Sequence, residues 1–527
     1  MGQASRTGVL LLPPLAYEDT SAYRPLRVLA DAVASAGHLV LRLDWPGQGD
    51  SQAEALSPQL HELRLGVVVE AAARLRAAGC QQVLGIAVRA GGLLALASGA
   101  FDALALWDCP ATGRRYLREQ KAFHRMAAAS FGGGPAATPS PEGSIEAGGF
   151  LHGPEVVGAL EAFDPKSAVR AVRRALLIGR DGAAPDAGLV EALRAAGAEV
   201  EVEQGQGMAV LLENAYHADL AAGVRERIVD WVGTPAELHE PDLDLAPSLV
   251  LDRGVERPWL ERGGAGQLSG IVCEPQHGAR PGMAWTVFLN AGGIRRCGPN
   301  RLWTLAARAL AAQGRPSLRF DVRDVGDSDG SAEPHQDLEA MYAPTSIDDA
   351  LQAVDWARDQ GAGSVDVVGL CSGAFLGAQV SARRSIRRAL LFNCLAFVWD
   401  EEARASSMTA HIRGSLFDAR RWKRLLTGKI DGRALARAVV NKGRLRLRAL
   451  RTGEQADAVE ALLTEIQARG TQLHLVYSEG DPAIAYLAGH VPVDRQPPTT
   501  VLPGADHTVR PVALHSRVVD LILGPPV

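Results

Sequence analysis

The sequence lacks the features that mark membrane and secreted proteins. It has no apolar run of the roughly 18 residues that a membrane-spanning helix needs. Its first residues, MGQASRTGVLLLPP, carry a single arginine and reach two prolines after a short apolar run, which makes a poor secretory signal. We therefore expect a soluble, cytoplasmic protein.

Lysine is also scarce, and basic charge is not in excess. Only 5 of the 55 basic residues among the 527 are lysine, and the net charge is −5 at pH 7. Proteins dedicated to nucleic-acid binding are usually strongly basic. With 47% hydrophobic and 22% charged residues, the composition is that of a globular protein. We expect neither a nucleic-acid nor a membrane partner.

The cysteines lack the spacing of metal or redox motifs. No two of them form a C-x-x-C pair, and none lies at zinc-site spacing from histidine. Scattered cysteines in a large chain are typical of free thiols in a reducing compartment. We expect no metal and no other cofactor. The six cysteines are Cys80, Cys109, Cys273, Cys297, Cys371 and Cys394.

A tandem repeat organises the chain. An apolar strand pattern, a loop, a helix pattern, a second strand and a Gly-rich turn follow one another over residues 9–51 and again over 286–328. The tripeptide Gly-Asp-Ser ends both stretches, at 49–51 and at 326–328, 277 positions apart. Pro13 and Asn290 keep the same offset. A shared order of elements at constant offset indicates two copies of one domain.

Strands that alternate with helices predict a mostly parallel sheet covered by helices on both faces. We therefore expect an α/β fold with two tandem domains, at 1–235 and 240–527, divided by the acidic, proline-containing stretch 234–248. The second domain begins with extra strand material over 256–275, which predicts an edge hairpin. Each domain carries an insertion, and the Arg-rich one at about 398–450 is predicted to be a helical lid.

The pentapeptide GLCSG at 369–373 is the most informative motif. It follows the apolar strand SVDVVGL and opens a helix. A residue in the middle of such a sharp turn needs small neighbours, and the helix dipole favours an anion there. These conditions predict a nucleophile elbow with Cys371 as the nucleophile. The alternative is an inert cysteine, because free cysteine is among the most buried residue types.

The elbow, the NAGG loop at 290–293 and the turn DVRDVGDS at 321–328 resemble the α/β-hydrolase superfamily, closest to its serine-hydrolase and thioesterase-like members. The chain differs from the commonest pattern in having cysteine where serine is usual, as in dienelactone hydrolases. The resemblance implies an acid after a late strand and a histidine near the C-terminus, which fall on Asp481 and His507. It also implies an oxyanion hole of backbone N–H groups, from Ser372 and from Ala291 or Gly292.

Several alternatives stay open at this point. Asp481 could only cap the helix that follows it, with Glu479 or Asp506 as the acid instead. Ser372 competes with its neighbour as the nucleophile, although it stands one position late. In the loop after Asn290, we consider that residue, Arg295, Arg296 and Cys297 as substrate ligands, against the alternative of a solvated loop face.

The first copy lacks these parts. Arg89 stands at its elbow, and Pro13-Pro14 replaces the oxyanion loop, where proline has no N–H to donate. Asp181 and His217 stand near the acid and histidine positions with no nucleophile to activate. We interpret 1–235 as a degenerate, non-catalytic domain with a structural, lid-forming or partner-binding role.

These residues predict an acyl-transfer enzyme of the thioesterase or acyltransferase type. Cys371 would carry the acyl group, His507 would take its proton, and Asp481 would orient the imidazole. We expect an acyl thioester substrate from a biosynthetic pathway, carried by coenzyme A or by an acyl carrier protein. A dienelactone-hydrolase-like ester or lactone hydrolase and a non-catalytic interaction scaffold are the alternatives. A homodimer through the first domain stays open.

Overall fold

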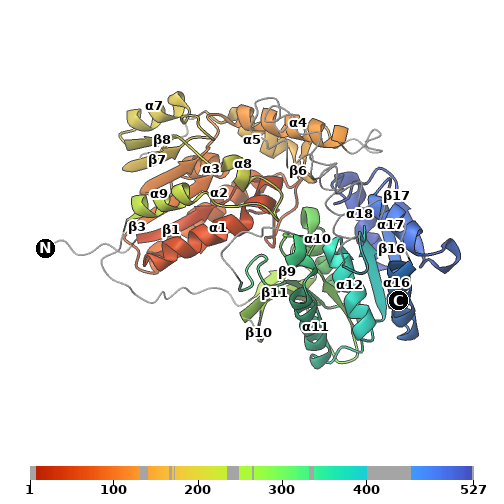
Figure 1. The fold of residues 1–527 in the computed structure, drawn as a ribbon. Helices are drawn as coiled ribbons and strands as arrows, with labels where there is room; N and C mark the ends of the chain where they lie inside the picture. The colour runs from red at the N-terminus through yellow and green to blue at the C-terminus, as the bar shows by residue number, and fades with distance from the viewer. Residues whose placement is uncertain are drawn as a thin grey trace.

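The protein is described here by a computed structural model that covers residues 7–130, 140–164, 169–170, 172–233, 248–263, 266–330, 338–399 and 453–524. Two separate large sheets lie one in each half of the chain, and Figure 1 shows them side by side, from red to yellow and from green to blue. The lid predicted at about 398–450 lies almost wholly outside the described residues.

The first sheet has six strands, all paired in parallel. Its apolar strands place successive side chains on opposite faces, so both faces need helices to cover them. The strand order is β2 (Leu39–Arg42), β1 (Thr7–Leu12), β3 (Gln82–Val88), β4 (Ala103–Trp107), β7 (Arg174–Ile178) and β8 (Glu199–Glu203).

Helices cover both faces of this sheet. The residues of β1 divide between two apolar clusters, with Val9 and Leu11 in one and Leu10 and Leu12 in the other. The cluster with Val9 includes α1 (Tyr17–Ser35), α8 (Met208–Leu211) and α9 (Ala222–Val232). The opposite cluster includes α2 (Leu60–Ala77), α3 (Gly91–Ser98), α4 (Gly113–Ser130), α5 (Pro154–Ala162) and α7 (Ala187–Ala195).

The second sheet repeats this order. Six of its strands run parallel as β13 (Ser317–Asp321), β12 (Ala284–Phe288), β14 (Ser364–Leu370), β15 (Arg388–Phe392), β16 (Gln472–Ser478) and β17 (Thr499–Leu502). In chain order within each half, both sheets therefore read second, first, third, fourth, fifth, sixth. This shared topology supports the repeat that the sequence predicts.

An antiparallel extension distinguishes the second sheet. The long strands β10 (Gly254–Gly263) and β11 (Gly266–Glu274) form a hairpin that pairs with β13, and the short strand β9 (Leu249–Leu251) lies at its outer edge. The predicted edge hairpin is confirmed. A smaller hairpin of β5 (Ile145–Ala147) and β6 (Phe150–His152) belongs to the first half.

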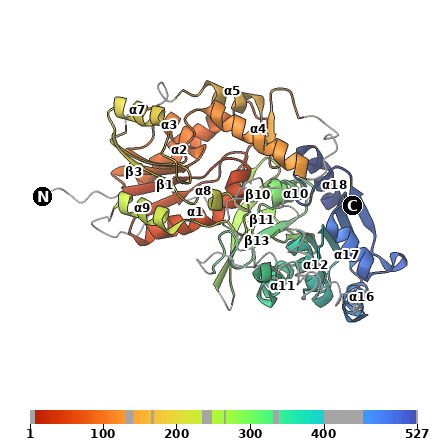
Figure 2. The ribbon, with the colours of Figure 1, turned by 45° about the horizontal axis from the view of Figure 1, so that its top comes forward.

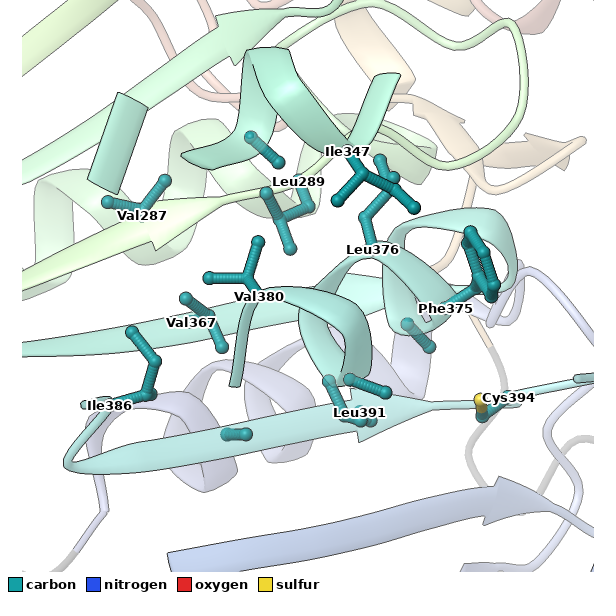
Figure 3. Packing of buried hydrophobic residues seen from close by; sticks show 14 of the residues in the cluster. Val287, Leu289, Ile347, Val367, Phe375, Leu376, Val380, Ile386, Leu391 and Cys394 are labelled. Carbon is teal, nitrogen blue, oxygen red and sulfur yellow. The ribbon is translucent and has the colours of Figure 1, made fainter. Parts of the chain in front are cut away.

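The second core also has two faces. One contains α10 (Leu302–Ala312) and α18 (His515–Leu523). The other contains α11 (Pro344–Asp359), α12 (Ser372–Arg383), α16 (Gly453–Ala468) and α17 (Pro482–His490). Figure 3 shows part of this second face, where Leu376 and Val380 of α12 lie beside Leu289 and Val367. This packing holds α12 against the sheet, beside the C-terminal end of β14 where the elbow lies.

Buried charges join the two halves. Arg295 of the second half lies 2.7 Å from Asp44 of the first, and Arg319 lies 2.6 Å from Asp50. In return, Tyr23 of α1 donates a hydrogen bond to Asp327. The Gly-Asp-Ser turns of the two repeats therefore face each other across one interface. Figure 2 shows the second sheet's β10, β11 and β13 next to the first half.

No helix in the described ranges is long and apolar enough to cross a membrane.

Candidate active site

Cys371 occupies a strained turn between β14 and α12. Its backbone has φ 57° and ψ −115°, a conformation that side-chain-bearing residues rarely adopt. Its N–H donates a hydrogen bond to the carbonyl of Phe392 at 3.0 Å. Strain of this kind costs about 1–3 kcal/mol and is typical of functional positions. The turn leaves Cys371 half-buried at the N-terminal end of α12.

The glycines on either side of the elbow are required by space. A Cβ on Gly369 would lie 2.1 Å from the carbonyl oxygen of Gly373, and a Cβ on Gly373 would lie 2.5 Å from that of Asn290. Both distances are far below ordinary contact. The G-x-C-x-G spacing therefore lets strand, helix and oxyanion loop approach one another closely.

His507 and Asp481 lie together beyond the C-terminal ends of β17 and β16. Nδ1 of His507 donates to Oδ2 of Asp481 at 2.7 Å. Oδ1 of the same carboxylate accepts a hydrogen bond from the N–H of Ala483 at 2.9 Å, at the start of α17. Asp481 therefore caps its helix and holds the histidine at once, so the two interpretations left open by the sequence are compatible.

The charge environment of His507 depends on Cys371. Burial lowers the pKa of His507, but the adjacent Cys371 sulfur and the Asp481 carboxylate outweigh it, and the pKa lies well above its usual value. The Nε2 atom of His507 is buried, and no hydrogen bond of ordinary geometry occupies it. The histidine is thus held by Asp481 on one nitrogen and has its other nitrogen available to the cysteine.

The other candidate acids have different partners. Glu479 accepts a hydrogen bond from the N–H of Gly504 at 3.0 Å. Asp506 accepts one from the N–H of Arg510 at 2.8 Å and also pairs with its guanidinium. Of the three carboxylates considered, Asp481 is the one for which a hydrogen bond to His507 is observed.

The loop after β12 lies against the elbow, as an oxyanion hole requires. The N–H of Gly292 donates to Oγ of Ser372 at 2.8 Å. This contact engages the Ser372 hydroxyl and occupies the Gly292 N–H. The backbone N–H groups of Ala291 and Ser372 are therefore the better pair of candidate oxyanion donors.

Asn290 has a structural position. Its side chain is buried, donates to the carbonyl of Ile294 at 3.0 Å and accepts from the N–H of Val322 at 2.8 Å. It also donates to Asp321 at 3.2 Å. These contacts fix the oxyanion loop to the end of β13 and leave little capacity for a substrate.

Three further residues proposed as substrate ligands are buried elsewhere. Arg295 lies 2.7 Å from Asp44, and its guanidinium lies 3.8 Å from the ring centroid of Tyr23. Arg296 pairs with Asp321 at 2.8 Å and with carboxylates on both sides of the interface. Burial raises the pKa of Cys297 to about 12. Arg295 and Arg296 therefore pair with carboxylates of the first half, and the expectation that these two residues and Cys297 contact substrate stays a prediction.

Asn393 is a site residue that the sequence analysis missed. It follows β15 with φ 46°, and its side-chain amide donates to the carbonyl of His507 at 2.7 Å. The same amide donates to Oγ of Ser478 at 2.9 Å, and the Asn393 side-chain oxygen accepts from the Ser478 N–H at 2.7 Å. The histidine loop is thereby tied to two neighbouring strands. An asparagine directly after an apolar strand was the available signal.

Tyr342 is a second missed residue. It ends the short helix η2 (Leu338–Tyr342) and packs in the cluster against which Cys371 lies. Its ring stacks on Trp399 with centroids 3.6 Å apart and meets Phe375 edge-on at 5.0 Å. Burial and the neighbouring Cys371, through charge and a hydrogen bond, raise the pKa of Tyr342 well above its usual value. An aromatic wall therefore borders the cysteine.

The remaining cysteines have environments that disfavour a thiolate. Burial raises the pKa of Cys273 to about 12 and shifts Cys109 and Cys394 in the same direction. Cys80 is buried as well. Because the thiolate is the reactive form, these are poor candidates for a nucleophile.

The first half keeps the elbow but fills it with a buried ion cluster. Arg89 has φ 54°, as the elbow cysteine does in the second half, and is 2% exposed. Its guanidinium lies 3.1 Å from Glu18, 3.2 Å from Asp108 and 2.5 Å from Glu119. The position that would hold a nucleophile is occupied by a paired cation.

Asp181 and His217, the other two expected remnants in the first half, have separate surroundings. Asp181 accepts hydrogen bonds from the N–H groups of Met208 and Ala209 at 2.9 and 2.8 Å, so it caps α8. His217 is exposed. The described residues contain no group of three or more His, Cys, Asp or Glu side chains suited to a metal ion.

Comparison with known proteins gives structural similarity alone. No protein-family model and no curated protein matches the chain. A serine hydrolase homologue from Coxiella burnetii is 16% identical with a TM-score of 0.31, covering 50% of this chain and 95% of that one. A dienelactone hydrolase from Anabaena variabilis is 13% identical with a TM-score of 0.33, covering 51% and 96%. An esterase from an Arctic intertidal metagenomic library is 14% identical with a TM-score of 0.33, covering 53% and 97%.

The fold assignment rests on this chain's own elements. A mostly parallel sheet begins with an antiparallel hairpin, a strained elbow follows its third parallel strand, and acid and histidine follow its last two. Cys371, Asp481 and His507 follow one another along the chain in the order that the sequence resemblance assigns to a nucleophile, an acid and a histidine. The described residues of each half therefore form a mostly parallel sheet covered by helices, the α/β fold that the sequence predicts.

Proposed function

We propose that the protein is an acyl-transfer enzyme in which Cys371 carries the acyl group as a thioester. The observation that carries the proposal is the His507 imidazole, held by Asp481 at 2.7 Å and raised in pKa by the adjacent Cys371. In this proposal residues 240–527 are the catalytic domain and residues 1–235 are a non-catalytic domain of the same fold.

The chemistry follows from these positions. His507 accepts the thiol proton, and the Cys371 sulfur attacks the acyl carbonyl carbon. The bond to the donor thiol breaks, and the leaving thiolate takes the proton from His507. In the second half-reaction an acceptor (water, an amine or an alcohol) gives its proton to His507 and attacks the thioester carbon. The carbon–sulfur bond to Cys371 breaks, and His507 returns the proton to the Cys371 sulfur. Asp481 orients the imidazole and stabilises its cationic form throughout.

The oxyanion of each tetrahedral intermediate would accept hydrogen bonds from the N–H groups of Ser372 and Ala291. Fixed donors of this kind stabilise charge that develops in the transition state, and one such donor is worth about 3–4 kcal/mol. The close approach of Gly373 to Asn290 keeps the two donor segments together.

A thioester donor suits a cysteine nucleophile. Exchange of one thioester for another is nearly isoenergetic, and the acyl-cysteine remains reactive toward amines and alcohols. We propose acyl thioesters of coenzyme A or of an acyl carrier protein as donors. Hydrolysis of an ester or lactone would use the same residues with an oxygen leaving group.

The test is turnover by variants of the cysteine. Cys371→Ala should lower kcat/KM for acyl thioesters by about 10³-fold or more, because the covalent route is lost. Cys394→Ala removes a neighbouring buried thiol and should leave the rate within a few fold. Turnover of Cys371→Ala at the wild-type rate would contradict the proposal.

Two further outcomes separate the alternatives. A wild-type protein that cleaves enol lactones far faster than acyl thioesters is a lactone hydrolase of the dienelactone type. If iodoacetamide alkylates Cys371 no faster than Cys109, the elbow is unactivated and the protein is a scaffold. Acyl transfer predicts selective alkylation of Cys371.

A further inference from the structure

One side chain of the non-catalytic half lies in the core of the catalytic half. Tyr216 follows α8 in the first half, yet it is 3% exposed and belongs to an apolar cluster whose other buried members all lie between residues 259 and 491. Cys371 packs against the same cluster. Tyr216 of the first half therefore lies among residues of the second half, in the surroundings of the elbow.

The backbone at Tyr216 lies directly on the oxyanion loop. A Cβ placed on Gly293 would be 2.9 Å from the carbonyl oxygen of Ala215 and 2.9 Å from the nitrogen of Tyr216. Only glycine permits that approach. Gly293 adjoins Gly292, whose N–H binds the Ser372 hydroxyl, so the segment of the first half contacts the loop that holds the elbow.

Tyr216 also lies close to the aromatic wall of the site. Its phenol is among the groups that raise the pKa of Tyr342, and Cys371 raises the same pKa through its charge and a hydrogen bond. The two tyrosines share one buried cluster with Phe375. Together with Trp399, which stacks on Tyr342, they make an apolar, aromatic border on one side of the nucleophile.

The segment that carries Tyr216 is braced. The carbonyl of Asn214 accepts hydrogen bonds from the N–H groups of His217 at 2.8 Å and Ala218 at 2.9 Å. The Asn214 side chain accepts a third from the N–H of Tyr216 at 3.1 Å. A turn with three internal hydrogen bonds is suited to hold a side chain in one place.

A second contact brings the first half to the histidine side of the site. Glu146 of the β5–β6 hairpin accepts a hydrogen bond from the N–H of Val512 at 3.1 Å. At the tip of this hairpin, a Cβ on Gly149 would lie 2.3 Å from the side chain of Asn300. Asn300 donates to the carbonyl of Thr508 at 2.8 Å, next to His507. The first half thus reaches both the cysteine loop and the histidine loop.

We propose that the N-terminal half is a fixed lid over Cys371 and that Tyr216 forms the wall which limits the size of the acyl group. The inference rests on the proposed function where it says that the group limited in size is an acyl group. The limited access to the Cys371 thiol does not depend on that function. The aromatic border favours acyl groups with an apolar portion over charged ones. Tyr216 is a specificity-determining residue in this account and takes no proton.

The experiment measures access to Cys371 with two thiol reagents of different size, iodoacetamide and monobromobimane, with modification located by peptide mass spectrometry. Tyr216→Ala should raise the rate ratio of the large to the small reagent by about tenfold, since a removed wall relieves a steric limit. Tyr216→Trp should lower the ratio. Tyr216→Phe keeps the ring and should leave the ratio unchanged.

The two size changes keep the test decisive if one variant fails to fold. An unchanged ratio in whichever of Tyr216→Ala and Tyr216→Trp folds would overturn the proposal. So would an equal acceleration of both reagents, which indicates loss of docking between the halves.

A series of acyl thioesters of increasing chain length extends the test to turnover. Tyr216→Ala should shift the preference toward longer chains. A changed alkylation ratio without any thioester turnover would refute the proposed function and keep the lid. Turnover with an unchanged ratio would do the reverse.

Discussion

At the scale of single residues, the site depends on side chains that serve two neighbours at once. Asp481 caps α17 with one oxygen and holds His507 with the other. Asn393 bonds both the His507 carbonyl and Ser478. Cys371 borders His507 on one side and Tyr342 on the other. Each shared contact limits how far a catalytic group can move from its partner.

The coupling between Cys371 and His507 gives a titration prediction. Cys371 is the largest influence that raises the pKa of His507, against the burial that lowers it. Cys371→Ala should therefore lower the pKa of His507, because burial then opposes Asp481 alone. NMR of labelled histidine rings measures this directly. Cys394→Ala should leave the His507 titration unchanged, and an identical pKa in wild type and Cys371→Ala would contradict the assignment.

Some residues at this scale could be predicted from the sequence, and others could not. Cys371, Asp481 and His507 could be predicted from the sequence because each follows an apolar strand, and their order along the chain is recognisable. The ion pair of Arg295 could not be predicted, because in sequence an arginine buried between two domains looks like a substrate-binding arginine until its partner is known. That partner, Asp44, lies 251 positions away. Tyr216 gave no signal, since its neighbours come from the other half.

At the scale of elements, the repeat is carried by strands and glycine-rich turns. The strand order of the two sheets agrees because the same alternation of apolar strands and helices occurs twice. The elbows share a positive φ, 54° at Arg89 and 57° at Cys371, while differing in side chain. The structure of the insertions could not be predicted from this alternation of strands and helices. The β5–β6 hairpin is short, and its position depends on contacts with the second half.

That hairpin contains a histidine with a marked pH effect. His152 is buried against Tyr116, with ring centroids 5.9 Å apart, and burial and nearby Arg64 lower its pKa to about 3. The unfolded chain binds a proton here near pH 6.5, but the folded chain does not until about pH 3. The folded state should therefore lose stability as pH falls through this window, by up to about 1.4 kcal/mol per pH unit.

His152→Phe removes this proton uptake and strands no partner, because neither ring nitrogen of His152 has a hydrogen bond. Urea unfolding should show that the variant gains about 2 kcal/mol relative to wild type between pH 7.5 and pH 5. The exposed His277→Phe variant serves as the control and should show no such gain. Equal slopes for His152→Phe and wild type would contradict the effect.

At the scale of the whole molecule, the two halves share a strand order but differ in the side chain at the elbow. The first half has a paired arginine where a nucleophile would stand, and it contacts the second half beside both the oxyanion loop and the histidine loop. The interface between the two halves contains many buried ion pairs in addition to apolar contacts. In the proposed function, the first half would thereby complete the site of the second half without supplying a catalytic residue.

Asp50 is the centre of that interface. Burial raises its pKa, but Arg296, Arg319 and Arg295 more than offset this, and the pKa of Asp50 lies below its usual value. Asp50→Asn should reduce the free energy of unfolding by up to about 3–5 kcal/mol, because it removes one of the buried carboxylates that balance these guanidinium groups. Breaking the exposed Glu70–Arg74 pair with Glu70→Gln should cost under about 1 kcal/mol. Equal losses from the two variants, measured by denaturant unfolding, would show that the interface charges contribute little.

The most direct test of the central claim is the intact mass of the protein after rapid mixing with an acyl thioester and acid quenching. The account predicts one added acyl group in the wild-type protein, located on the peptide that contains Cys371, and none in Cys371→Ala. A wild-type protein that turns over the thioester without this adduct, or an acyl group that persists on Ser372 in Cys371→Ala, would contradict it.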